Sequence, residues 1–313
     1  MSRTLLSRLL VSGAACALAA CGGGGGSGVS FTPPPPTTKT CPDGSVIPTS
    51  QPCPTPPPPT AAIFPNVTTD TNFAVLGLEA TAPNTAASDL NENGFSVRYD
   101  AATQNYLIDL PSHGEATLQI DSQDATYWHG RAFTGFYEGT WVDVFKPTST
   151  NPEIQLAYTS FGATSSYDTS DFGFFAFGIP TPSSGVPVTG SASYNALIVG
   201  RPLDIDGIIG GDATLQFNFG AGTLSGVFDP VLQFNGVETD LGSYNFVNTV
   251  FGVGSATFSG GLAHSGTNSR GAFNGRFTGP AAEELMGRWT APYRNPTTQQ
   301  WNEMFGIMVG KKQ

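Results

Sequence analysis

Charged and metal-binding side chains are scarce in this chain of 313 residues, and their scarcity excludes several classes of function. Only 12% of the residues are charged, and 13 Lys and Arg stand against 24 Asp and Glu, for a net charge of −11. So acidic a surface argues against binding of nucleic acid or of anionic headgroups. The three histidines, His113, His129 and His264, lie far apart in sequence with no cysteine nearby. We therefore expect neither a metal site nor a resident cofactor.

The residue sets of common catalytic sites are missing as well. No Gly-x-Ser-x-Gly nucleophile motif occurs. Glu283 and Glu284 are adjacent, so on a helix they would diverge and could not flank a sugar as paired acid and base. Asp204-x-Asp206-Gly207 resembles the start of a calcium loop, but the later ligands are absent, and we interpret it as a β-turn. The sequence therefore predicts a protein that is not an enzyme.

Long apolar runs are also absent, and the one short run lies near the N-terminus. Leu9–Ala20 is apolar over about a dozen residues, too short to span a bilayer as a permanent helix. Arg3 and Arg8 precede the run, which ends in Leu-Ala-Ala directly before Cys21. This arrangement resembles a bacterial lipoprotein signal, which implies removal of residues 1–20 and acylation of Cys21. The alternative is an ordinary secretory signal whose cysteine is accidental.

Residues 21–62 are rich in glycine and proline, and we expect them to form a disordered tether. The glycines after Cys21 make a flexible coil, whereas Pro33–Pro36 and Pro56–Pro59 are stiff polyproline segments. Such a composition cannot bury a core. In well-studied bacteria an aspartate after the lipidated cysteine marks retention in the inner membrane. Gly22 therefore favours a lipid-anchored protein of the outer membrane.

Two cysteines of the tether remain for pairing. Cys16 is lost with the signal and Cys21 is lipidated, which leaves Cys41 and Cys53. Because an exported protein meets an oxidising environment, we expect these two to form a disulfide. Their spacing is not Cys-x-x-Cys, so a structural loop is favoured over a catalytic dithiol.

Strand patterns fill most of the chain after residue 62. Leu215, Phe217 and Phe219 alternate with polar residues, and Gly220–Gly222 separates them from a hairpin partner over residues 223–228. No amphipathic helix of three turns is found, and the best short one spans Pro280–Leu285. The expected strands are residues 94–99, 106–110, 116–120, 139–145, 155–161, 172–177, 214–219, 223–228, 272–278 and 304–309. This pattern predicts an all-β sandwich or barrel.

A motif near the C-terminus carries a family resemblance. Its residues are Gly271, Phe273, Gly275, Phe277, Gly279, Pro280, Glu283, Gly287 and Trp289. The segment is similar to the closing part of the eight-stranded barrel of transferrin-binding protein B and its surface-lipoprotein relatives, and Phe305–Lys312 matches their terminal Phe-Gly strand. The resemblance implies an eight-stranded antiparallel barrel over residues 191–313, preceded by a β-rich, handle-like region over residues 63–190. Phe273, Phe277, Trp289 and Phe305 are expected to lie inside.

The same resemblance implies a surface-exposed lipoprotein whose barrel loops bind a macromolecular partner, with iron- or haem-carrying proteins among the candidates. Full transferrin receptors have two lobes and this chain has room for one, so transferrin capture does not carry over. Two alternatives remain: a small-ligand or haem carrier that uses the barrel interior, and a structural envelope lipoprotein. The many inward Phe and Leu residues predict a filled interior, which favours the first function, whereas a cavity would favour a carrier.

Overall fold

The structure, a computed structural model, describes the chain continuously from residue 171 and in segments before it. The described residues are 38–40, 46–52, 63–80, 86–92, 94–110, 114–120, 131–137, 139–145, 151, 153–166 and 171–313. The chain divides into two compact units, residues 1–58 and residues 59–313.

The first unit contains a short antiparallel strand pair. β1 (Thr38–Thr40) pairs with β2 (Val46–Pro48), with Lys39 opposite Ile47. The tether expected over residues 21–62 therefore includes one short strand pair. Threonine, valine and isoleucine favour extended backbone, and a Pro-Asp-Gly sequence lies between the two stretches.

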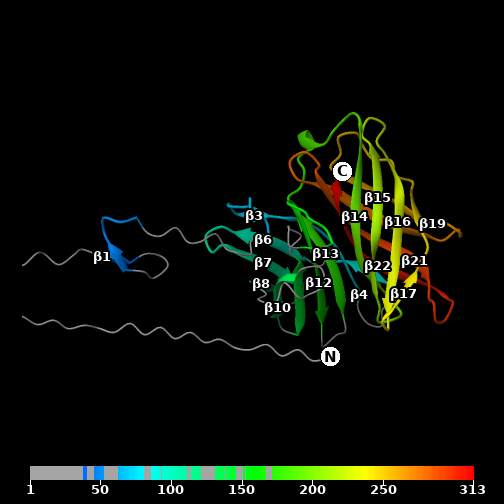
Figure 1. Cartoon of the computed structure of the whole chain (residues 1–313), viewed down its shortest axis with the longest axis horizontal. Coiled ribbons are helices and arrows are strands. Elements are labelled where there is room, and N and C mark those ends of the chain that lie inside the picture. Colours follow the sequence, from blue (N-terminus) through cyan, green and yellow to red (C-terminus); the bar gives the residue numbers. More distant parts are fainter. Residues whose placement is uncertain are drawn as a thin grey trace, which may run out of the picture. The chain divides into compact units, whose positions relative to one another are not determined.

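The described part of the second unit contains two sheets and a closed barrel (Figure 1). The four-stranded sheet has the order β3 (Thr71–Asn72), β6 (Ser96–Asp100), β7 (Asn105–Leu110) and β8 (Gly114–Thr117). The seven-stranded sheet has the order β5 (Ala87–Asp89), β4 (Ala74–Ala80), β13 (Phe172–Gly178), β12 (Thr159–Ser166), β11 (Thr140–Phe145), β10 (Arg131–Tyr137) and β9 (Gln119–Ile120). Several neighbouring strands, such as β10 to β13, follow one another in the sequence, as the predicted meander requires.

The barrel is formed by the C-terminal strands. They are β14 (Ser191–Pro202), β15 (Ile208–Asn218), β16 (Thr223–Phe234), β17 (Val237–Asp240), β18 (Tyr244–Val247), β19 (Thr257–His264), β20 (Arg270–Thr278), β21 (Glu284–Arg294) and β22 (Trp301–Lys312). Eight of them form a ring of antiparallel pairs, while β17 pairs only with β16 at the side. β22 closes the ring by pairing with β14, with Leu197 opposite Val309. The predicted eight-stranded antiparallel barrel is confirmed, and so is its closure by the terminal strand.

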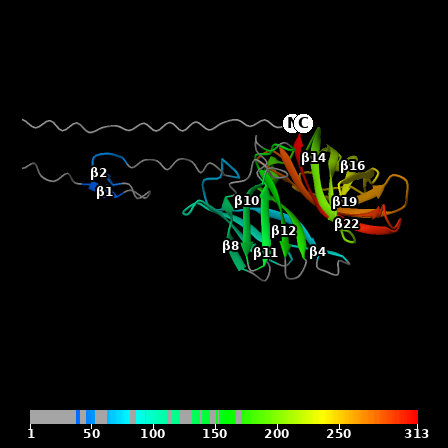
Figure 2. The same cartoon turned by 60° about the horizontal axis from the view of Figure 1, so that its bottom comes forward.

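Three apolar cores hold the second unit together. The first fills the barrel interior and includes Leu215, Phe217 and Phe219, the residues that the alternation places on one face. The second joins the four-stranded sheet to one face of the seven-stranded sheet. The third joins the other face of the seven-stranded sheet to the outer wall of the barrel along β14, β21 and β22. Figure 2 shows this sheet alongside the barrel strands β14 and β22.

Phe305 corrects one expectation about the barrel. It is buried, but it belongs to the third core, where its ring centroid lies 5.7 Å from that of Phe172 and 6.1 Å from that of Phe174. Phe305 therefore faces outward and is covered by the seven-stranded sheet. Its neighbours on β22, Met304 and Met308, are the residues that face the interior.

The prediction of a short helix over Pro280–Leu285 is wrong. The chain makes a turn after β20 and enters β21 at Glu284. Gly279 and Ala282 have φ angles of +84° and +57°. Two residues of left-handed backbone within four positions are incompatible with a right-handed helix. The expected strand over residues 155–161 also begins later, at Thr159.

The described helical content is small. η2 (Ser183–Gly185) is a single 3-10 turn. Among the described residues, no helix is long and apolar enough to cross a membrane.

Candidate functional site

Aromatic side chains fill the interior of the barrel. The ring of Phe217 lies 4.8 Å from that of Phe277 and 5.0 Å from that of Phe258, and Phe228 lies 4.9 Å from Trp289, all between centroids. These separations are those of rings in direct contact. The Trp289 indole N–H donates to the carbonyl of Ile307 at 2.8 Å, so its polar atom is satisfied. The interior is thus occupied by side chains, which favours a binding function on the outer surface over a carrier function inside.

The aromatic residues of the C-terminal motif lie in this interior. Phe273, Phe277 and Trp289 are all fully buried there. Gly275 and Gly287 pair across β20 and β21 and make room for the neighbouring side chains. A Cβ on Gly275 would lie 2.5 Å from Cζ of the Phe258 ring, and one on Gly287 would lie 2.6 Å from Cε of Met308. Glycine is needed at position 275, next to a rigid ring, whereas at position 287 a side chain would require Met308 to move.

The remaining motif residues shape strand contacts and the turn between β20 and β21. A Cβ on Gly271 would lie 2.7 Å from Cα of Ala291 on the neighbouring strand. Gly279 supplies left-handed backbone, and Pro280 after it is exposed. Glu283 accepts a hydrogen bond at 2.8 Å from the backbone N–H of Ala281. These contacts are internal to the barrel and its turn.

Glu284 is a buried residue whose place the sequence analysis missed. It is 1% exposed, and its carboxylate accepts hydrogen bonds from the backbone N–H groups of Ala157 at 2.6 Å and Tyr158 at 2.9 Å. Burial raises the pKa of Glu284, while the two N–H donors and Lys311 oppose that shift. The side chain therefore fastens the segment before β12 to the start of β21. The sequence gives only one sign of this burial, an acidic residue followed by apolar residues. The same pattern is also found at the start of a helix.

Asp204 organises one end of the barrel. Its carboxylate accepts hydrogen bonds from Asn295 at 2.7 Å, from Asn302 at 2.6 Å and from the Tyr293 hydroxyl. Asp206 instead pairs with Arg201 at 3.1 Å. Both carboxylates are thus engaged by protein groups. Within the described segments, no cluster of His, Cys, Asp and Glu is suited to hold a metal ion.

His264 lies among aromatic rings at the same end of the barrel. Its ring is perpendicular to those of Tyr244 and Trp301, with centroid distances of 4.9 Å and 5.6 Å. Its Nε2 is 3.2 Å from the carbonyl oxygen of Leu241. His113 and His129 lie outside the described residues. So do Cys21, Cys41 and Cys53, and their lipidation and pairing stay predictions.

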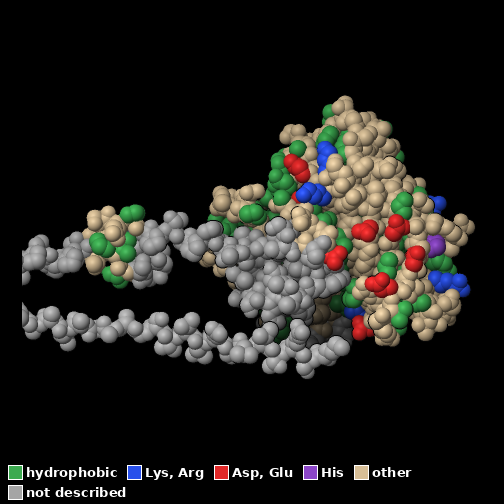
Figure 3. All heavy atoms as spheres, viewed as in Figure 1, with side chains coloured by type: hydrophobic (Ala, Val, Ile, Leu, Met, Phe, Trp, Pro, Cys, Tyr) green, Lys and Arg blue, Asp and Glu red, His purple; other side chains and the backbone are tan. Residues whose placement is uncertain are grey.

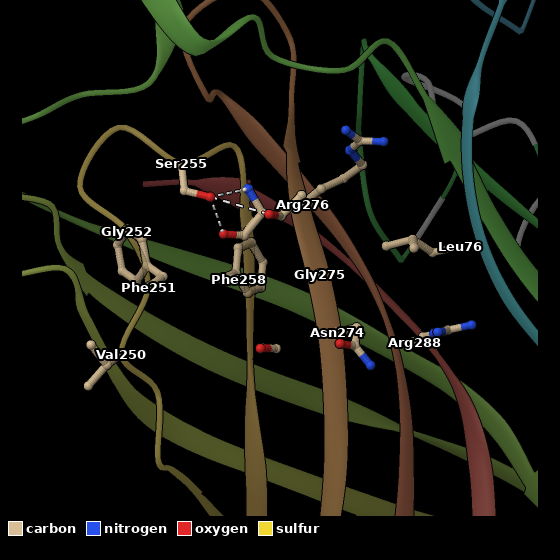
Figure 4. A pocket seen from close by; sticks show the side chains of 12 residues that line it. Leu76, Val250, Phe251, Gly252, Ser255, Phe258, Asn274, Gly275, Arg276 and Arg288 are labelled. Carbon is tan, nitrogen blue, oxygen red and sulfur yellow. Dashed lines mark hydrogen bonds between the residues drawn. The ribbon is translucent and has the colours of Figure 1, made fainter.

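A polar groove lies on the outer wall of the barrel, with a volume of about 460 Å³ (Figure 4). It is bounded by β19, β20 and β21, by the connection before β19, and by Leu76 of β4. Its lining residues are Leu76, Val250, Phe251, Gly252, Ser255, Thr257, Phe258, Ser259, Asn274, Gly275, Arg276 and Arg288. Figure 4 shows Arg276 and Arg288 extending toward the side on which Leu76 lies. The groove thus gathers two of the few arginines of this acidic chain.

The two arginines of the groove differ in their partners. Arg288 is paired with Asp89 of β5. Arg276 has no ion-pair partner among the described residues, and its Nε is buried without an acceptor. Burial lowers the pKa of Arg276, and no carboxylate of the described residues opposes that shift. The groove therefore holds one uncompensated positive charge.

An exposed aromatic pair lies on the β10–β11 hairpin. Phe136 and Trp141 are directly opposite each other across the two strands, with ring centroids 4.9 Å apart. They remain 53% and 42% exposed. Val142 and Val144 of β11 face the second core, so Trp141 points to the opposite face, the one on which Phe145 joins the third core. The pair therefore lies on the same face of the seven-stranded sheet that packs against the barrel, but outside the part that the barrel covers.

A seven-stranded sheet that packs on an eight-stranded barrel, with a four-stranded sheet on its other face, defines the class of fold. No protein-family model matches the chain. The chain is similar in structure to transferrin-binding protein B of Haemophilus parasuis Hp5, with a TM-score of 0.48 and 17% identity, over 76% of this chain and 44% of that one. It is also similar to the N-lobe of lactoferrin-binding protein B of Moraxella bovis, with a TM-score of 0.36 and 13% identity, over 76% of this chain and 99% of that one. Another similar structure, described as a surface lipoprotein, gives a TM-score of 0.39 and 12% identity, over 77% of this chain and 98% of that one.

A more distant similarity is found in sequence. Over 169 residues the chain is 27% identical to the Neisserial heparin binding antigen of Neisseria meningitidis serogroup B. The matched part covers 52% of this chain and 30% of that protein, so the chain spans about 30% of the length of its curated relatives. The structural likeness concerns the fold. The names of these relatives describe binding proteins and antigens.

Proposed function

We propose that this protein is a lipid-anchored surface lipoprotein that binds a protein partner, and that Phe136 and Trp141 form part of the contact surface. The observation that carries the proposal is the exposure of two paired aromatic rings on an otherwise well-packed sheet. Aromatic residues are enriched among the residues that dominate binding energy at protein interfaces. Because the two rings are held against each other across the strands, little side-chain conformational entropy is lost when a partner binds.

Loops at one end of the barrel supply a second part of the surface. Val188, Val250 and Val253 are exposed large apolar residues of the connections before β14 and before β19. A Cβ built on Gly254 would lie 3.5 Å from Cγ1 of Val188, so the two connections meet. The family resemblance implies that barrel loops contact the partner, and we assign these exposed valines to that contact.

The charge of the chain narrows the class of partner. The names of the relatives mention transferrin, lactoferrin and heparin. Heparin is a polyanion, and this chain has a net charge of −11, with acidic side chains spread across the barrel face seen in Figure 3. A protein with basic or neutral surface fits this charge better than a polyanion does. Iron- and haem-carrying proteins stay candidates for that partner.

Anchoring through Cys21 is part of the same proposal. Removal of Arg3 and Arg8 with the signal takes the net charge from −11 to about −13, and the tether of residues 21–62, with its Cys41–Cys53 loop, would hold the folded part away from the lipid. Cells that produce Cys21→Ser protein should incorporate no labelled palmitate into it. Unchanged labelling of this variant would rule out Cys21 as the anchor.

A capture experiment tests the binding function. The protein is used as bait in the growth medium of its host, and captured proteins are identified by mass spectrometry alongside a haem absorbance scan. The Trp141→Ser and Phe136→Ser variants should lose the captured protein, whereas Trp301→Ser, which removes another exposed tryptophan, should retain it. Equal capture by all variants would refute the assigned surface. Capture of nothing by the wild type would favour a structural envelope lipoprotein.

A further inference from the structure

The groove on the outer wall of the barrel is built by three neighbouring strands. Ser259, Asn274 and Arg288 lie side by side across β19, β20 and β21, and Thr257 lies beside Arg276 in the next outward row. These side chains alternate with the inward aromatic residues, so they all point away from the core. The volume of about 460 Å³ is within the range of sites for small organic ligands.

The charge of the groove selects a singly charged anion. Asp89 compensates Arg288, which leaves Arg276 as the one uncompensated charge among the lining residues. The chain as a whole carries a net charge of −11, whereas the half-buried guanidinium of Arg276 gives the groove a local positive charge. A guanidinium matches the planar geometry of a carboxylate and donates two parallel hydrogen bonds to it. Asn274, Ser259 and Thr257 offer further polar contacts.

Apolar side chains bound the same groove. Phe251 and Val250 lie on the connection before β19, and Leu76 lies on β4 of the neighbouring sheet. Val250 is largely exposed, so an apolar group in the groove would cover it. We propose that the groove binds a carboxylate that carries an apolar body, with Arg276 holding the carboxylate. Such a ligand is either a small free acid or an acidic side chain flanked by apolar residues in a bound peptide.

Binding of matched probes tests this site. The full chain with Cys21→Ser, which removes the acylation site, is titrated with 3-phenylpropionate and with its uncharged amide while the arginine Nε–H resonances are followed by NMR. The acid should shift the Arg276 resonance and bind at least about tenfold more tightly than the amide. A difference of about tenfold in affinity is expected when one charge-assisted hydrogen bond is lost. In a second arm, the peptides acetyl-Leu-Glu-Leu-amide and acetyl-Leu-Gln-Leu-amide replace the acid and the amide.

Three variants locate the binding. Arg276→Gln should weaken binding of the acid by about tenfold or more, and Ser259→Glu should do the same by placing a carboxylate in the groove. Arg294→Gln removes one positive charge from the far end of β21 and should leave binding unchanged. Thermal melting of each variant checks that it is folded, and Ser259→Glu, at an exposed position, serves if Arg276→Gln does not fold.

Each outcome bears on the proposal. Tighter binding of the free acid alone assigns a small ligand, and tighter binding of the Glu peptide alone assigns an acidic segment of a partner. Equal affinity for acid and amide, no binding of either probe pair, or an Arg294→Gln loss as large as that of Arg276→Gln would overturn the site. Capture through Phe136 and Trp141 is tested separately, so failure of one proposal leaves the other standing.

Discussion

Single residues of this protein take their roles from the side of the barrel wall on which they lie. Trp289 and Phe305 are both aromatic, fully buried and on neighbouring strands. Trp289 fills the interior, whereas Phe305 packs outward against the seven-stranded sheet. Burial alone therefore does not tell which core a residue stabilises.

The two faces of β20 provide a test at this scale. Phe277→Ala removes a fully buried ring that contacts Phe217, and it should destabilise the fold by about 3–5 kcal/mol. Arg276→Ala, one residue away on the outer face, removes a guanidinium without a partner and should cost below about 1 kcal/mol. Urea titrations of both variants measure the difference. Equal losses would refute the register of β20.

Glu284 gives a second prediction, for the dependence of stability on pH. Burial raises the pKa of Glu284 above its ordinary value, so ionisation of this carboxyl weakens the folded state as the pH rises through the raised pKa. The stability of the wild type relative to Glu284→Gln should therefore fall as the pH rises above the ordinary pKa of a glutamate and through the raised pKa of Glu284. Urea titrations at several pH values measure this difference. A relative stability that grows with pH would show that the Ala157 and Tyr158 donors outweigh burial.

The sequence predicted the interior residues better than the outer ones. Leu215, Phe217 and Phe219 alternate with exposed polar residues, and that period reveals the inward face. On β22, residues of both faces are apolar because one faces the interior and the other faces the sheet, so no period distinguishes Phe305 from Met304. Nor can a local pattern reveal that Glu284 meets backbone groups 126 and 127 residues away.

At the scale of elements, the barrel depends on the seam between β14 and β22. The two strands are far apart in sequence and pair from Tyr194 with Lys312 to Pro202 with Met304. Gly306 and Gly200 lie opposite each other in this seam, beneath the ring of Trp289. The small residues allow the strands to approach while a large ring occupies the interior.

A substitution at this seam should prevent closure. A Cβ on Gly306 would lie 2.6 Å from Cα of Gly200 and 2.9 Å from the Trp289 ring, so Gly306→Val should abolish folding or lower the melting temperature strongly. Gly210→Ala is the matched control, because a Cβ there meets no atom within 4 Å. Melting followed by circular dichroism compares the two. A Gly306→Val protein as stable as Gly210→Ala would contradict the observed seam.

Strands could be predicted where polar and apolar residues alternate regularly between glycine turns, and less well elsewhere. The hairpin of β15 and β16 was predicted from its alternation and its glycine turn. β19, with two central glycines, and β4, with buried residues on both faces, show no such period and were not predicted. The sequence at Pro280–Leu285 predicts a helix because proline and acidic residues are common in the first turn of a helix. The positive φ angles of Gly279 and Ala282 show that the segment is a turn instead.

At the scale of the whole molecule, the seven-stranded sheet is covered on both faces along much of its width. The barrel covers one face and the four-stranded sheet the other, which explains why every residue of β13 is buried. Toward its β9–β10 side, the described apolar pair Phe136 and Trp141 is exposed to solvent. The packed barrel interior and this exposed pair together favour a function on the outer surface.

Photo-crosslinking on living cells tests this account most directly. A p-benzoylphenylalanine residue in place of Trp141 should crosslink a protein added outside the cells, because this side chain is proposed to lie both at the cell surface and in the contact. The same residue in place of Val237, an exposed position at the side strand β17, should give no such product. A crosslinked partner at position 141 alone is the predicted result. No product at position 141, or equal products at both positions, would contradict the assignment of a partner-binding surface to the aromatic pair.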